Sequence, residues 1–65
     1  MTNFDRMKLI KAGYILLRIH TQPEFYITRT NEKGNWGKYD KYVSNAAMQR
    51  EVKRINEHEP LIIFE

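Results

Sequence analysis

Cysteine is absent from this 65-residue chain, and serine occurs only once. Without cysteine the chain has no disulfide, no thiolate metal ligand and no thiol nucleophile, and it suits a reducing compartment. The one serine, Ser44, stands where a helix cap is expected, so a serine nucleophile with a base beside it is not indicated. These absences predict a cytoplasmic protein that is not an enzyme.

Histidine is nearly as scarce, since His20 and His58 are the only two. The run Glu57-His58-Glu59 places three potential ligands in a row, but adjacent helical residues point in divergent directions. We therefore expect no metal and no cofactor. Gly34 and Gly37 favour a hairpin turn, because a phosphate loop needs a longer glycine-rich run between a strand and a helix. No small-molecule substrate is predicted.

Long hydrophobic runs are also missing. The longest strongly apolar runs, residues 14–17 and 61–64, are far shorter than the ~20 residues that span a bilayer. Residues 1–14 are charged throughout and lack the apolar core segment of a signal peptide. We therefore expect no membrane partner.

The size and the charge of the chain restrict its partners. A domain of 65 residues buries only about 60% of its unfolded surface, so we expect residues 1–65 to form one marginally stable domain, for which a protein partner or a homodimer is an open option. The net charge is +3, with eight Lys and Arg against four acidic residues in 1–43, and three against four in 44–65. A basic surface should lie on the first part, where nucleic-acid contact is permitted but not required.

Two helices are predicted at the two ends of the chain. Thr2 or Asn3 can cap the first, and Gly13 supplies the left-handed residue that ends it. Ser44 or Asn45 can cap the second, which runs to about residue 57. The buried stripe of the second helix consists of Met48, Val52 and Ile55.

Alternating apolar residues predict three strands, at residues 14–20, 24–30 and 36–43, with a turn at 31–35. On the first strand one face carries Ile15, Leu17 and Ile19, and the other carries Leu16, Arg18 and His20. The apolar tail at 61–64 suits a short further strand, packing over the core, or an exposed sticky end. The predicted fold is α+β, with an N-terminal helix, a three-stranded antiparallel sheet and a C-terminal helix packed on one sheet face.

The loop between the second and third strands decides which side chains face outward. A four-residue loop would put Lys38 opposite Ile27 and bury a charge without a partner, so we favour a five-residue loop. The pairs it predicts are Thr30 with Trp36, Thr28 with Lys38, Ile27 with Tyr39, and Phe25 with Lys41. This register assigns Tyr39 and Val43 to the core. It leaves Trp36 outside the core, either covered by another element or available to a partner.

The sheet face opposite the core gathers rings, hydroxyls and cations. Rings stack on bases, hydroxyls contact the backbone and cations neutralise phosphates, so this face is a candidate nucleic-acid surface. Its candidate residues are Arg18, Tyr26, Thr28, Arg29, Trp36 and Lys38. The same residue types also stabilise ordinary small sheets. A non-catalytic module that contacts nucleic acid is the leading hypothesis. A protein-interaction or self-associating module that uses Trp36 or the apolar tail is the alternative.

Several resemblances accompany these hypotheses. Three strands, the third of which begins with Trp36 after a glycine turn, are followed by a helix entered through Ser44-Asn45-Ala46-Ala47. This order is similar to the three-stranded sheet plus helix of recombinase arm-binding and plant ethylene-response-type DNA-binding domains, which implies major-groove reading by the sheet. The element order also resembles double-stranded RNA-binding domains, although the basic cluster expected at the start of the second helix is absent. The stretches 11–18 and 46–50, with Trp36 and Lys41-Tyr42, resemble small uncharacterised proteins of Bacteroides-type gut bacteria or their mobile elements, which implies no particular activity.

Overall fold

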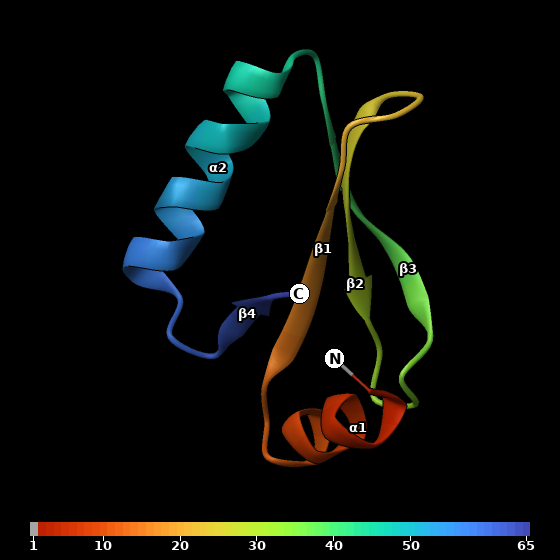
Figure 1. The fold of residues 1–65 in the computed structure, drawn as a ribbon. Helices are drawn as coiled ribbons and strands as arrows, with labels where there is room; N and C mark the ends of the chain where they lie inside the picture. Colours follow the sequence, from red (N-terminus) through yellow and green to blue (C-terminus); the bar gives the residue numbers. More distant parts are fainter. Residues whose placement is uncertain (1) are drawn as a thin grey trace.

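The computed structural model describes residues 2–65, and within them the chain forms two helices and one four-stranded sheet. In chain order the elements are α1 (Asn3–Lys11), β1 (Ile15–His20), β2 (Phe25–Thr30), β3 (Trp36–Tyr42), α2 (Asn45–His58) and β4 (Ile62–Phe64). Helix α2 runs along one side of the sheet, and α1 lies at the end where β2 turns into β3 (Figure 1). The predicted α+β class is confirmed.

Both helices begin at the caps that the sequence offers. The Thr2 hydroxyl accepts a hydrogen bond from the backbone N–H of Asp5 at 3.1 Å, and the Ser44 hydroxyl accepts one from that of Ala47 at 3.2 Å. Gly13 follows α1 with a φ of 98°, a conformation that glycine adopts at little cost. Because α1 has only nine residues, its stability depends on packing against the sheet.

The sheet is mixed, with the strand order β3-β2-β1-β4. The three predicted strands pair in antiparallel fashion, and the apolar tail adds β4 as a fourth strand parallel to β1. Ile15 pairs with Ile62, and Leu17 with Phe64. Of the three options that the sequence left open for the tail, the short further strand is the one adopted.

The core lies between α2 and one face of the sheet. Leu17, Ile27, Met48 and Ile55 are fully buried there. Met48 and Ile55 come from the predicted stripe of α2, and Val52 packs against the same cluster. The helical periodicity therefore identified the buried edge of α2 correctly.

A β-bulge in β3 changes the expected register halfway along the β2–β3 pair. The pairs Thr30 with Trp36 and Thr28 with Lys38 are as predicted, but the register then shifts by one residue. Beyond the shift, Ile27 pairs with Asp40, Tyr26 with Lys41, and Phe25 with Tyr42. The expected pairs of Ile27 with Tyr39 and Phe25 with Lys41 are therefore wrong. The extra residue turns both Tyr39 and Tyr42 toward the core and carries Lys41 to the opposite face.

Two burial predictions also need correction. Val43 was expected in the core but is 96% exposed, because β3 ends at Tyr42 and the chain turns there into α2. Leu16 was expected on the outer face of β1 beside Arg18, yet it is fully buried. That face is covered at this point, since α1 packs against β1 and Ile63 of β4 pairs beside Leu16.

The hydroxyl of Tyr42 is buried and has no hydrogen-bond partner in the described part of the chain. Burial is the main cause that raises the pKa of Tyr42 to about 12, and the Asp40 carboxylate adds to it. An unpaired buried hydroxyl costs about 1–3 kcal/mol. We expect Tyr42→Phe to leave the free energy of unfolding in urea unchanged or to raise it by about 1 kcal/mol. Tyr39→Phe is the control, and a clear loss of stability in Tyr42→Phe would contradict the expectation.

No helix within residues 2–65 is both long enough and apolar enough to cross a membrane.

Candidate functional site

The sheet face opposite α2 contains an open groove of about 590 Å³. We call it the sheet groove, and its lining residues are Pro23, Glu24, Tyr26, Thr28, Trp36, Gly37, Lys38 and Lys41. Its volume lies within the range of about 300–1,000 Å³ that is usual for ligand sites. Two aromatic rings, a hydroxyl and two ammonium groups thus surround one concave surface.

The Tyr26 ring is held from the β1 side by His20. The two rings are stacked, with centroids 4.3 Å apart and planes 3° from parallel. The His20 ring in turn is fixed by a hydrogen bond of 2.9 Å between its Nε2 atom and the Thr28 hydroxyl. Tyr26 is therefore a pre-positioned ring, and His20, which the sequence placed on the outer face of β1, is a half-buried supporting group.

The Trp36 ring lies against two guanidinium groups. The Arg18 guanidinium carbon is 4.2 Å from the ring centroid, and that of Arg6 on α1 is 5.6 Å away. Both distances are within the range of cation–π attraction. Trp36 is consequently half-buried: Arg6 and Arg18 cover part of it, and another part lines the sheet groove.

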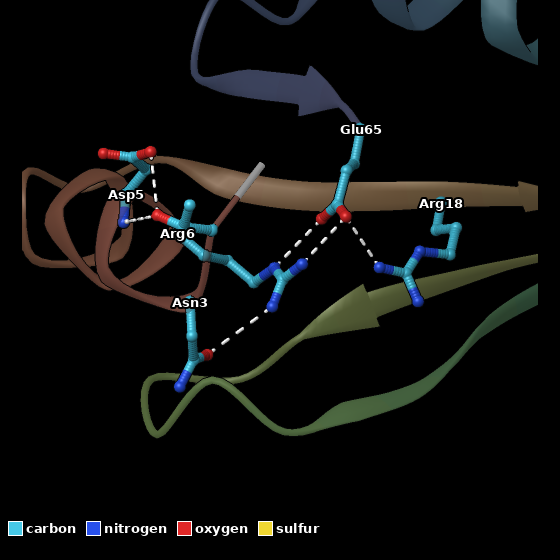
Figure 2. A network of polar contacts seen from close by, with 6 residues as sticks. Asn3, Asp5, Arg6, Arg18 and Glu65 are labelled. Carbon is cyan, nitrogen blue, oxygen red and sulfur yellow. Dashed lines mark hydrogen bonds and ion pairs between the residues drawn. The ribbon is translucent and has the colours of Figure 1, made fainter.

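A carboxylate joins these two arginines. Figure 2 shows Glu65, directly after β4, between Arg6 and Arg18. Arg6 donates to it through Nε at 3.0 Å and Nη2 at 2.8 Å, and Arg18 donates through Nη2 at 2.7 Å. We call these three residues the arginine clamp. The hydrogen bonds from Arg6, and next those from Arg18, lower the pKa of Glu65 to about 2. The clamp therefore joins α1, β1 and the residue that follows β4.

Two lysines form the β3 side of the groove. Lys38 and Lys41 are both exposed, and they lie opposite Thr28 and Tyr26. Lys41 forms an ion pair of 3.0 Å with Glu24, and more than half of each side chain is accessible to solvent. Such exposed pairs contribute little to stability, so Lys41 can exchange this carboxylate for another anion at small cost.

The six sequence-predicted residues fall into three groups. Tyr26, Thr28, Trp36 and Lys38 line the sheet groove together. Arg18 lies beside it, against Trp36 and within the arginine clamp. Arg29 does not line the groove, because alternation along β2 puts it on the side of Ile27; it contributes to a smaller adjacent hollow that shares Trp36, Gly37 and Lys38.

Sequence reasoning missed Lys41, Arg6 and Glu65. A signal for Lys41 was present, because the straight register placed it opposite Phe25 on the core side. That register buries a charge without a partner, which is the reason for which the four-residue loop was excluded in the case of Lys38. No comparable signal existed for Arg6 and Glu65, since 59 residues separate them along the chain.

The described residues hold no group of three or more His, Asp or Glu side chains that could bind a metal ion. His58 and Glu57, singled out from the sequence, are mostly exposed at the end of α2.

Comparisons of the chain with protein-family models, with curated proteins and with solved structures gave no match.

Proposed function

We propose that this protein is a small non-catalytic binding module that contacts nucleic acid through the sheet groove. The observation that carries the proposal is the gathering of Tyr26, Trp36, Lys38 and Lys41 around one concave surface. Rings of this kind stack on bases, and ammonium groups at the rim neutralise phosphates. A cytoplasmic location and the likeness to small proteins of Bacteroides-type bacteria are parts of the same proposal.

The charge around the groove supports an anionic partner. Arg6, Arg18, Lys38 and Lys41 supply four positive charges, and Glu24 and Glu65 supply two negative ones, which leaves a balance of +2. The two carboxylates already occupy the arginines and Lys41. Lys38 forms no ion pair with another residue of the described chain, so no carboxylate has to be displaced before it contacts a phosphate.

The alternative, a protein-interaction or self-associating module, has less support from the geometry. It relied on an exposed Trp36 or on a free apolar tail. Trp36 is instead half-buried against Arg18, and Ile62–Phe64 pairs with β1 as an edge strand of the sheet. Leu61, 56% exposed, is the one residue of the tail that remains largely on the surface.

The test uses the single Trp of the chain, because Trp36 lines the groove and its fluorescence reports on binding there. We expect the emission to change on titration with mixed single-stranded and duplex oligonucleotides at about 50 mM salt, and the affinity to fall as salt rises. Lys38→Glu should weaken binding about tenfold or more, because it replaces attraction to a phosphate by repulsion.

Lys53→Glu is the matched control, since it makes the same charge change on an exposed position of α2, in the layer on the other side of the sheet. If both variants lose affinity equally, the effect is one of net charge and not of the groove. Absence of binding at low salt, combined with a concentration-dependent mass in solution, would overturn the proposal in favour of self-association.

A further inference from the structure

We infer that the sheet groove takes single-stranded nucleic acid, with an unpaired base stacked on Tyr26 and successive phosphates on Lys38 and Lys41. This inference rests on the proposed function and makes it specific. It is carried by the stacking geometry of Tyr26, by the spacing of the two lysines and by the cover that α1 provides at one end of the face.

The Tyr26 ring is prepared for stacking from one side only. His20 lies parallel to it at 4.3 Å on the β1 side, and His20 does not line the groove. The neighbour of Tyr26 on the other side is Lys41 of β3, which does line it. The second face of the Tyr26 ring is therefore the one that borders the groove. A base placed there extends a stack that already exists, so little side-chain freedom is lost on binding.

A base within a duplex cannot use such a platform. Its two faces are already stacked on neighbouring base pairs, whereas a base of a single strand can leave its neighbours and lie on an aromatic ring. Duplex reading by a sheet also requires strands that enter a major groove about 12 Å wide. Here the surface is hollow, and Arg6 of α1 lies over Trp36 at the end of the groove nearest the β2–β3 turn. Both features favour a flexible strand over a duplex.

The lysines define the path of the strand. Lys38 and Lys41 lie opposite Thr28 and Tyr26, which are two residues apart on β2, so the lysine positions are about 7 Å apart along the strand direction. That spacing resembles the distance between successive phosphates of an extended single strand. Without the bulge, Lys41 would be opposite Phe25 on the core face, and only one of the two phosphate positions would exist.

The number of phosphate contacts gives a quantitative expectation. Two contacts on a single strand predict that log K falls with log salt with a slope of about −1.4, since each contact contributes about −0.7. The two arginines and Glu65 together keep a net charge of +1, but both arginines are held by Glu65 within the clamp, so we count no direct phosphate contact from them. Lys38→Gln should reduce the slope to about −0.7.

The experiment titrates Trp36 fluorescence of the full chain with ten-nucleotide oligothymidylate and oligouridylate, and with a ten-base-pair DNA duplex. We expect both single strands to bind at least tenfold more tightly than the duplex, and the ratio of the two to show whether the 2′-hydroxyl is sensed. Tyr26→Leu should lower single-strand affinity about tenfold, and Tyr26→Phe should retain it, because phenylalanine keeps the ring face.

Circular dichroism and urea unfolding show whether Tyr26→Leu is folded. If Tyr26→Leu is unfolded, Tyr26→Phe, which keeps the ring, is the variant whose binding is compared with that of the native chain. Equal binding of duplex and single strand, with Tyr26→Leu unaffected but Lys38→Glu weakened, would overturn the single-strand inference and leave the proposed function standing. A slope much steeper than −1.4 would overturn the two-phosphate path. If the native chain binds none of these oligonucleotides, both the single-strand inference and the proposed function are overturned.

Discussion

Leu17→Ala is expected to cause a large loss of stability, the largest of the substitutions considered for this domain. Leu17 is fully buried at the centre of the core, on the strand that pairs with both β2 and β4. Removing a buried leucine side chain costs about 2–5 kcal/mol, because transfer free energy is lost and a cavity remains. A domain of 65 residues has roughly 3–10 kcal/mol of stability in total. The substitution therefore removes about a fifth of the stability at the least, and all of it at the most.

Urea unfolding followed by circular dichroism measures this effect. Leu61→Ala is the matched control, since it makes the same chemical change at a side chain that is 56% exposed. We expect the control to change the free energy of unfolding by no more than about 0.5 kcal/mol. Equal losses in the two variants would mean that the core does not lie where the structure puts it.

Features that depend on local sequence were predictable. The caps at Thr2 and Ser44 and the stripe of Met48, Val52 and Ile55 follow from side-chain chemistry and helical spacing, and the structure contains them. The first half of the β2–β3 register was predictable for a similar reason, because the loop and one potential buried charge, at Lys38, were enough to choose between two options.

Features that depend on a one-residue irregularity or on contacts between distant segments were not predictable from the sequence. A bulge adds no distinct residue type to the sequence, and the straight register differs from the true one by a single position beyond Thr28. Its consequence for the candidate site is large, because it moves Lys41 from the core face into the groove. The parallel pairing of β4 with β1 joins segments about 47 residues apart, and no local pattern encodes such a partner.

Glu65→Gln is the second substitution with a large expected effect, because the Glu65 carboxylate accepts hydrogen bonds from α1 and from β1. The Glu65 side chain is only 15% exposed, and the amide keeps its shape while removing its charge, so two guanidinium groups are left to repel each other. We expect the free energy of unfolding at pH 7 to fall by about 1 kcal/mol, a value reduced for the remaining solvent contact. The melting temperature should fall by about 4–8 °C.

The pH dependence identifies the cause of this loss. The ordinary pKa of Glu65 is 4.5, and the arginine clamp lowers it to about 2 in the folded protein. A carboxyl group with a lowered folded-state pKa stabilises the fold above its unfolded-state pKa, and this contribution disappears as the pH falls toward the folded-state pKa. The stability difference between the native chain and Glu65→Gln should therefore be constant above about pH 5, shrink between about pH 5 and pH 2, and vanish below that.

Glu57→Gln is the control for this series, because it removes one negative charge from a mostly exposed position on α2. Its stability curve should run close to that of the native chain across the same pH range, since exposed pairs contribute little. If the curve of unfolding free energy against pH for Glu65→Gln runs parallel to that of the native chain down to pH 2, the clamp does not stabilise the folded state. If the curves converge as expected, the two arginines are held by an internal carboxylate at neutral pH. Lys38 and Lys41 then remain the cations with which the groove meets a phosphate.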